Sequence, residues 1–299
     1  MQSITLRQLR YCDALATFGH FGRAAEACSI SQPAISVQIK ELEETLGVKL
    51  FERGARQVQL TTFGEDFVQR ARDIIRSVDD LGDLARSSVT DFTGRLKLGI
   101  IPTVAPYLLP RIISELTLQY ESLDIQVRES QTNLLLSELS AGKLDAAILA
   151  LPISEPSLVE LPLFTEEFLL VRHADDAGKP VPDAGSLRDM RLLLLEEGHC
   201  FRDQALSFCG MRRLLPRDRM EGSSLSTLVQ MVSAGLGVTL IPQMAVTVET
   251  RSAPVSLARF NLPRPSRTIG MIWRKTSPLA AQFQDIANVV KAAAEKNSL

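Results

Sequence analysis

The sequence contains few cysteines, few aromatic residues and no long apolar segment. Four cysteines among 299 residues are too few for the disulfide scaffold of a small secreted domain. No apolar run approaches the roughly 20 residues that a membrane-spanning helix needs. The opening residues MQSITLRQLR lack the apolar core of a secretory signal. We therefore expect a cytoplasmic protein without a membrane segment.

Several short motifs of enzymes and metalloproteins are also missing. The sequence has no Cys-x-x-Cys pair, no Gly-x-Ser-x-Gly sequence and no phosphate-binding glycine loop. His199, Cys200 and Cys209 would give a zinc ion only three ligands, at a spacing that no common zinc site uses. We therefore expect neither a metal ion nor a cofactor.

A charge of one sign is absent as well. The net charge is −2, with 45% hydrophobic and 23% charged residues, a composition typical of soluble proteins with buried cores. Residues 1–62 carry seven Lys/Arg and six Asp/Glu, so even this segment is nearly neutral. An argument for nucleic-acid binding must therefore rest on motif and geometry rather than on a basic total.

The pattern along the chain predicts two or three domains, as the length suggests. Short helices joined by tight turns fill residues 1–62, a single polar-rich helix follows over 63–91, and strands alternate with helices over 92–299. Such alternation predicts an α/β fold with mainly parallel sheets. Two α/β subdomains, about 92–165 with 268–299 and about 166–267, would place a cleft between them where open sheets bind ligands.

Runs of apolar residues and helix-end signals locate the elements of this α/β part. Strands are predicted at Arg95–Ile101, Ile125–Glu129, Ala146–Leu149, Phe168–Val171, Leu192–Leu195, Val238–Ile241 and Ile269–Trp273. Helices are predicted at Tyr107–Gln119, Asn133–Ala141, Arg202–Cys209, Ser224–Ala234 and Pro278–Lys296.

The N-terminal segment has the pattern of a winged helix-turn-helix. After two short helices, Ser31 can cap a third, Pro33 suits its first turn and Gly47 can end it. Two short strands around Gly54 would form the wing. The exposed face of the third helix offers groups suited to a major groove, and the wing offers two arginines for phosphates. These candidate DNA-binding residues are Ser31, Gln32, Pro33, Ser36, Val37, Lys40, Arg53 and Arg56. The alternative is that any three-helix cluster has one polar face.

The long helix carries a narrow apolar seam with the spacing four, three, four, three, four. Its members are Phe67, Ala71, Ile74, Val78, Leu81 and Ala85. A seam of this a/d type is buried only against another helix, so we interpret it as a dimerisation helix, which also suits the reading of paired DNA half-sites. The alternative is a helix that lies on its own domain.

Three stretches resemble the LysR-type transcriptional regulators: FGRAAEACSISQPAIS from Phe21, EETLG from Glu43 and LFER from Leu50. The resemblance extends over the whole chain and implies a winged helix-turn-helix, a linker helix and a two-lobed effector domain like a periplasmic binding protein. It also implies homodimers that pair through the linker helix and usually assemble into homotetramers on double-stranded promoter DNA, with RNA polymerase as a further partner.

Within that family the chain is most similar to the members that sense hydrogen peroxide. The similarity lies in EEGHCFRDQALSFC from Glu196, IPTVAPYLLP from Ile101, ESQT from Glu129 and RTIG from Arg267. By this resemblance, Cys200 is the peroxidatic thiol and Cys209 the resolving thiol, and the residues around the peroxide are Thr103, Thr132, His199, Asp203 and Arg267. The chain departs from the pattern at Phe201, where a smaller aliphatic residue is common.

The chemistry of peroxide sensing fits these neighbours. A thiolate is the nucleophile toward peroxide, and His199, Arg202 and the start of a helix lie next to Cys200. Oxidation gives a sulfenic acid, which a second thiol converts into a disulfide. The Thr103 and Thr132 hydroxyls could hold the two peroxide oxygens in line for the attack.

The spacing of the two cysteines would make this oxidation a switch. If the segment is helical, nine steps of about 1.5 Å separate the Cα atoms by roughly 13 Å, whereas a disulfide needs about 4.4–6.8 Å. Residues 200–209 would have to refold, which can change a subunit interface.

Two other functions remain open at this point. A small organic effector could bind in the cleft between the two subdomains, or the chain could be a thiol peroxidase, although a helix-turn-helix argues against an enzyme. Cys12 and Cys28 are expected to be core residues.

Overall fold

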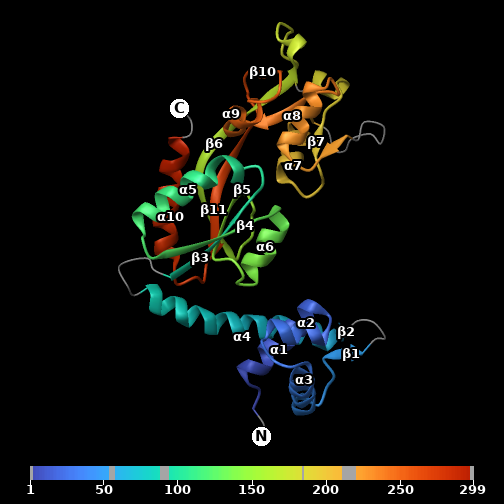
Figure 1. Cartoon of the computed structure of the whole chain (residues 1–299), viewed down its shortest axis with the longest axis vertical. Helices are drawn as coiled ribbons and strands as arrows, with labels where there is room; N and C mark the ends of the chain where they lie inside the picture. Colours follow the sequence, from blue (N-terminus) through green and yellow to red (C-terminus); the bar gives the residue numbers. More distant parts are fainter. Residues whose placement is uncertain (1–2, 54–57, 88–93, 184, 211–219, 297–299) are drawn as a thin grey trace. The chain divides into compact units, whose positions relative to one another are not determined.

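The computed structural model describes residues 3–53, 58–87, 94–183, 185–210 and 220–296. The chain divides into two compact units, residues 1–85 and 86–299, which are treated separately below (Figure 1). In the described part of the chain, no helix is long and apolar enough to cross a lipid bilayer.

The N-terminal unit is the expected winged helix-turn-helix. It contains α1 (Leu6–Phe18), α2 (Phe21–Ala27) and α3 (Gln32–Leu46). The antiparallel strands β1 (Phe51–Arg53) and β2 (Val58–Leu60) form the wing. Leu15, Ile35, Leu42 and Leu50 are completely buried between these elements, which explains why the helices carry apolar residues at intervals of three and four.

Side-chain caps and left-handed residues define the helix ends, as the sequence predicted. The Oγ of Ser31 accepts a hydrogen bond from the Ala34 amide at 3.4 Å, and Gly47 ends α3 with φ of +70°. At α1, Thr5 and Gln8 form a reciprocal capping box that satisfies two amides without partners within the helix.

The long helix α4 (Thr62–Ser87) begins against the wing. A Cβ atom at Gly64 would collide with the backbone carbonyl of Leu50, so glycine permits this close approach. Val68, one turn further on, is buried in the core of the N-terminal unit, and Ala71 is buried as well.

The larger unit is built on a mixed sheet of seven strands in the order β10-β6-β11-β5-β3-β4, with β9 also paired to β6. The strands are β3 (Gly94–Ile100), β4 (Leu123–Glu129), β5 (Ala146–Leu151), β6 (Leu158–His173), β9 (Thr239–Pro242), β10 (Val255–Arg259) and β11 (Ser266–Arg274). Among the described residues of this sheet, β3 is parallel to β4 and β5, and the other strand pairs are antiparallel. The prediction of mainly parallel sheets was therefore wrong, because β6 and β11 run antiparallel to their neighbours.

Strand β6 serves both halves of this unit. Residues 158–167 pair with β11, and residues 169–173 pair with β10. The predicted strand Phe168–Val171 covered only the second half. The first half contains Pro162 and four polar residues, Glu160, Thr165, Glu166 and Glu167, which weaken the apolar signal that a continuous buried strand would give.

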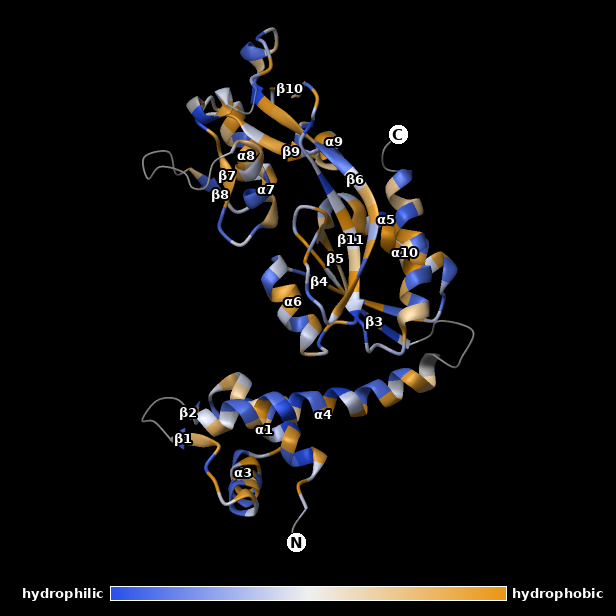
Figure 2. Ribbon diagram, turned by 180° about the vertical axis from the view of Figure 1, so that it is seen from behind, coloured by the Kyte–Doolittle hydropathy of each residue, from blue (hydrophilic) through white to orange (hydrophobic). Residues whose placement is uncertain are grey.

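Helices cover both faces of the sheet in the first half. Helices α5 (Ala105–Gln119) and α10 (Ala280–Glu295) pack together on one face, and α6 (Thr132–Ser140) lies on the other (Figure 1). Strand β5 between them is hydrophobic along its length (Figure 2), as expected for a strand buried on both faces.

The second half is smaller and carries α7 (Cys200–Phe208) and α8 (Leu225–Ser233). It also contains the parallel pair β7 (Leu194–Leu195) and β8 (Glu221–Gly222), and the short helix α9 (Val246–Glu249). Its buried apolar residues form a cluster separate from that of the first half. The five helices predicted in the α/β part all occur within two residues of their expected ends. The two-residue β8 and the four-residue α9 are too short to give a periodic signal, and the five-residue β10 was missed.

Tyr107 links the two halves. It belongs to α5 of the first half, but its ring packs in the apolar cluster of the second. Its hydroxyl donates to Oε1 of the buried Glu249 on α9 at 2.6 Å. Burial, together with this bond, raises the pKa of Tyr107 well above its usual value.

We expect Tyr107→Phe to lower the free energy of unfolding by about 1–3 kcal/mol, because the buried Glu249 carboxylate loses its donor. Urea unfolding of the full chain measures this loss. Glu249→Gln keeps an oxygen that can accept the bond and should cost less. A Tyr107→Phe variant as stable as the wild type would contradict the proposed link.

Candidate functional site

The two cysteines expected to react lie at opposite ends of one helix. Helix α7 begins at Cys200, two residues earlier than predicted, and ends at Phe208, with Cys209 as the next residue. Nine steps of about 1.5 Å place the two Cα atoms roughly 13 Å apart, and both thiols are free. The helical spacing on which the switch argument depended is therefore present.

The two thiols also belong to different apolar clusters. Cys200 is half-buried and packs against the cluster of the first half, whereas Cys209 is completely buried in that of the second. Burial raises the pKa of Cys209 to about 11, against the opposing effect of Arg188. At neutral pH Cys209 is therefore protonated and shielded from reagents.

A small pocket lies beside Cys200. It is lined by Ile101, Pro102, Thr103, Gln131, Thr132, His199 and Cys200. Its volume is about 10 Å³, which corresponds to about one water-sized molecule. The pocket combines residues from the loop after β3, the start of α6 and the start of α7, so three of the predicted pocket residues meet the predicted reactive cysteine.

Arg267 of β11 is bonded to Thr103, one of the residues that line this pocket. Its side chain is fully buried and forms an ion pair with Glu166 of β6 at 2.8 Å. Its Nη1 donates to the Thr103 hydroxyl at 2.8 Å and its Nη2 to the Thr103 carbonyl at 3.0 Å. Because the Thr103 hydroxyl oxygen accepts from Arg267, its own hydrogen remains available to donate to a molecule in the pocket.

Thr132 provides a second hydroxyl. It is the first residue of α6 and is buried, and its Oγ1 has no hydrogen-bond partner in the described part of the chain. A buried hydroxyl without a partner is costly, and a bound polar molecule would remove that cost. Next to it, Gln131 donates to the Glu197 carbonyl at 3.3 Å and so joins α6 to the loop before α7.

His199 lines the pocket as a neutral side chain near pH 7. Burial lowers its pKa below the usual value, against the opposing effect of the Glu196 carboxylate. A neutral imidazole can either accept or donate one hydrogen bond toward the pocket. It does not supply the positive charge that the sequence suggested for the neighbourhood of Cys200.

Neither Arg202, expected to act on the Cys200 thiol, nor Asp203, expected near the peroxide, is among the residues that line the pocket. Arg202 is buried, donates to the Leu195 carbonyl at 2.7 Å and pairs with Glu221 at 2.9 Å, so its charge is already neutralised. Asp203 is exposed on α7 and does not line the pocket. Its contact with peroxide stays a prediction.

The C-terminal end of α7 has its own attachment. The Nε of Arg188 donates to the carbonyl of Cys209 at 2.7 Å. Gly210, which follows with φ of +61°, lies against the same guanidinium. Sequence reasoning missed Arg188 and Glu166, because each acts through a partner far away in the sequence and neither belongs to a local motif.

A larger cavity of about 500 Å³ lies elsewhere in this unit, beside β6 and α9. Phe164, Glu167, Met244 and Arg259 are among its lining residues. Neither Cys200 nor Cys209 lines this cavity. In the described part of the chain, no group of three or more His, Cys, Asp or Glu residues is arranged to hold a metal ion.

The candidate DNA-reading residues lie together at the start of α3. Gln32, Pro33, Val37 and Lys40 are exposed, and Ser36 is half-buried. Ser31 is exposed but its hydroxyl caps the helix. Arg53 is the last residue of β1, and Arg56 lies outside the described residues.

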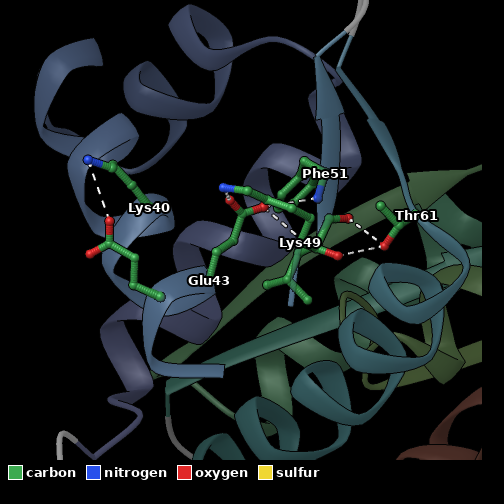
Figure 3. A network of polar contacts seen from close by, with 7 residues as sticks. Lys40, Glu43, Lys49, Phe51 and Thr61 are labelled. Atoms are coloured by element: carbon green, nitrogen blue, oxygen red, sulfur yellow. Dashed lines mark hydrogen bonds and ion pairs between the residues drawn. The ribbon is translucent and has the colours of Figure 1, made fainter. Parts of the chain in front are cut away.

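A buried carboxylate fixes this helix to the wing (Figure 3). Glu43 of α3 accepts from the Leu50 amide at 2.9 Å, the Phe51 amide at 3.2 Å and the Lys49 ammonium at 2.6 Å. Burial would raise the pKa of Glu43, but these bonds outweigh it and the pKa is lowered. Thr61 joins the same segment to α4, since its hydroxyl donates to the Lys49 carbonyl at 2.9 Å and accepts from the Gly64 amide at 2.9 Å.

The apolar seam of α4 divides into two parts. Phe67 packs against the core of the N-terminal unit, so for it the alternative of a helix lying on its own domain was correct, and Ala71 is buried. Ile74, Val78 and Leu81 are 51%, 38% and 64% exposed. Their apolar surface is available for another helix.

Comparison with known proteins assigns each of the two units to a protein family model. The profile of the bacterial regulatory helix-turn-helix protein of the lysR family matches residues 6–65, and that of the LysR substrate binding domain matches residues 90–295. The chain is 40% identical to the DNA-binding transcriptional dual regulator OxyR of Escherichia coli, over 97% of this chain and 95% of that protein.

Solved structures agree with this assignment. A full-length OxyR variant from Pseudomonas aeruginosa matches with a TM-score of 0.78 and 38% identity, over 97% of this chain and 96% of that one. A hydrogen-peroxide-bound OxyR mutant from Corynebacterium glutamicum matches with a TM-score of 0.67 and 36% identity, over 99% and 94% of the two chains.

We expect Glu43→Gln to destabilise the N-terminal unit by about 1–3 kcal/mol near pH 7, because a charge-assisted cluster of hydrogen bonds is lost. Hydrogen exchange of the amides of Leu50 and Phe51 in the full chain measures the effect. The pKa of Glu43 is lowered on folding, so its contribution is present above the pKa of the unfolded chain and disappears as the pH falls through the folded value.

The difference between wild type and Glu43→Gln should therefore shrink as the pH is lowered below the usual carboxyl pKa of 4.5. Glu44→Gln is the matched control, because Glu44 pairs with Lys40 at 3.5 Å on an exposed surface and such pairs contribute little. Equal protection of the two amides in both variants would show that the Glu43 cluster does not stabilise the wing.

Proposed function

The chain belongs to the LysR family of transcription regulators, and from this premise we propose how its thiols report hydrogen peroxide to DNA. It is a DNA-binding regulator of the peroxide-sensing kind. The observation that carries the proposed mechanism is the position of Cys200, which opens onto a pocket of about 10 Å³ and begins the helix that holds Cys209 at its other end.

The size of this pocket favours peroxide as the signal. Hydrogen peroxide has two heavy atoms, whereas an organic effector needs a site of several hundred cubic ångströms. The cavity of about 500 Å³ beside β6 has that size, but a molecule bound there would touch neither thiol. The arrangement of the pocket therefore favours peroxide over a small organic effector.

In the first step, the Cys200 sulfur attacks one oxygen of the peroxide. A sulfur–oxygen bond forms, the oxygen–oxygen bond breaks, and the leaving oxygen takes up a proton and departs as water. The sulfur is oxidised by two electrons and the peroxide is reduced by two. We propose that the hydroxyls of Thr103 and Thr132 hold the two oxygens in line, with Thr103 as a donor because its oxygen is occupied by Arg267.

In the second step, the Cys209 sulfur attacks the sulfur of the Cys200 sulfenic acid. A disulfide forms, the sulfur–oxygen bond breaks, and the hydroxyl leaves as water with the proton of Cys209. Because roughly 13 Å of helix separates the Cα atoms and a disulfide allows at most about 6.8 Å, α7 must unwind. The chain then changes shape once per oxidation and has no need of repeated turnover, so we propose a sensor rather than an enzyme.

We propose that the DNA-binding unit responds to this refolding through a change in how two copies of the chain pair. We propose that α3 enters the major groove with Ser31, Gln32, Pro33, Ser36, Val37 and Lys40, while Arg53 and Arg56 reach phosphates. The exposed part of the α4 seam supports a homodimer, which would assemble further into a homotetramer on promoter DNA in the cytoplasm and contact RNA polymerase there. The refolding of residues 200–209 would alter that assembly.

Mass spectrometry of the full chain after one equivalent of hydrogen peroxide tests the chemistry. We expect a Cys200–Cys209 disulfide, and we expect Cys200→Ser to lose the response while DNA binding is retained. Cys28→Ser is the matched control, because Cys28 lies in the N-terminal unit and should respond as the wild type. Oxidised protein without this disulfide would refute the mechanism.

Lys40→Ala tests the reading helix. We expect weaker binding to promoter DNA and a salt dependence of log K shallower by about one, as for the loss of one phosphate contact. Lys143→Ala removes an equally exposed lysine from the larger unit and should leave binding unchanged. Equal affinities of the two variants would remove Lys40 from the interface.

A further inference from the structure

The ring of Phe201 joins the sensing helix to the arginine behind the pocket. Phe201 follows Cys200 in α7 and is only 3% exposed. Its ring lies edge-to-face against Phe168 of β6, with centroids 4.8 Å apart and an interplanar angle of 70°. The guanidinium carbon of Arg267 lies 5.3 Å from the same ring.

These contacts complete the enclosure of the Arg267 charge. The edges of the guanidinium are occupied by Glu166 and by the two oxygens of Thr103. Phe201 then adds a cation–π contact, which is worth most where water is excluded. Withdrawal of Phe201 would therefore uncover a buried charge as well as leave a cavity beside Phe168.

Of the two thiols at the ends of α7, that of Cys200 is the less buried. Its thiol is half-buried at the edge of the first cluster, whereas Cys209 is completely buried in the second and its carbonyl is bonded to Arg188 at 2.7 Å. We therefore expect the Cys200 end to travel when the two sulfurs meet. Because Phe201 is its neighbour in the backbone, this movement pulls the ring from its site.

We propose that Phe201 is an anchor that holds α7 in its thiol form and sets the rate at which the oxidised Cys200 sulfur reaches Cys209. This inference rests on the disulfide proposed above. If Phe201 is an anchor, the sulfenic acid of Cys200 is long-lived. The first oxidation leaves the Phe201 ring in place, and the disulfide forms only after that ring has left its site. The speed of the first step depends on peroxide concentration, and that of the second does not.

Phe201→Leu tests the anchor in the full chain. The aromatic pair and the cation–π contact each correspond to roughly a fewfold to tenfold in rate, so we expect disulfide formation to become about tenfold faster. The first oxidation should change less than about threefold, because Arg267 keeps its bonds to Glu166 and Thr103. Rapid mixing with peroxide, followed by trapping of the sulfenic acid with a 1,3-diketone and mass spectrometry, resolves the two steps.

Two further variants give the comparison its controls. Phe283→Leu removes an equally buried ring that packs against Trp273 in the first cluster, and it should leave the disulfide step unchanged. Phe260→Leu removes the ring that packs on Phe208, at the other end of α7, and should accelerate the step far less than Phe201→Leu. If Phe201→Leu unfolds, Phe201→Met keeps most of the volume without the ring.

The possible outcomes distinguish failure of the Phe201 anchor from failure of the proposed Cys200–Cys209 disulfide mechanism. A wild-type chain that forms no Cys200–Cys209 disulfide would refute the proposed mechanism and the anchor with it. If the disulfide forms in the wild type but equally fast in Phe201→Leu, the mechanism stands and the anchor is wrong. Equal acceleration by Phe283→Leu, or acceleration by Phe260→Leu alone, would also overturn it, because the cause would then be general loosening or release of the Cys209 end.

Discussion

The guanidinium of Arg267 joins three parts of the larger unit that lie far apart in the sequence. It comes from β11, pairs with Glu166 of β6 and holds Thr103 in the loop after β3. A buried pair of charges is tolerated only where hydrogen bonds satisfy both partners. Glu166 meets this condition, because its second oxygen accepts from the Met244 amide at 3.1 Å. The Arg267–Glu166 pair therefore fixes the position of Thr103 in the pocket beside Cys200, since movement of either charge would break buried hydrogen bonds. The orientation of the Thr103 hydroxyl follows from its bond to Arg267.

Helix α7 imposes the complementary constraint on the thiols. As long as it is wound, Cys200 and Cys209 remain in separate apolar clusters, and the buried Cys209 stays protonated. Its two ends are held by different means, a buried arginine pair with Glu221 near the start and the bond from Arg188 at the end. Packed clusters of this kind resist small adjustments, so we expect the proposed refolding to lead to a second distinct arrangement rather than through a continuous range.

Much of this architecture could be predicted from the sequence, for reasons that are local. The caps at Ser31 and Gly47 and the apolar spacing of α3 act within a few residues, and they gave both ends of the helix correctly. The prediction of mainly parallel sheets failed because pairing depends on where β6 and β11 return to the sheet, which no local pattern records. Arg202 has the right sequence position to affect Cys200 but is committed to Glu221, and Glu166 has no motif at all. A resemblance to a family supplied Thr103 and Thr132; their contacts required the folded chain.

The joint at Glu43 and Thr61 has a mechanical consequence. Since α3, the start of the wing and the start of α4 share one hydrogen-bond network, we expect α3 and the 26-residue α4, which is about 39 Å long, to move together as a lever. A rotation of roughly 10° at one end of such an arm displaces the other by about 7 Å, or about two base-pair steps of 3.4 Å along DNA. In the proposed homodimer, a modest change in how the two α4 helices cross would therefore be enough to bring the two α3 helices into or out of register with paired half-sites.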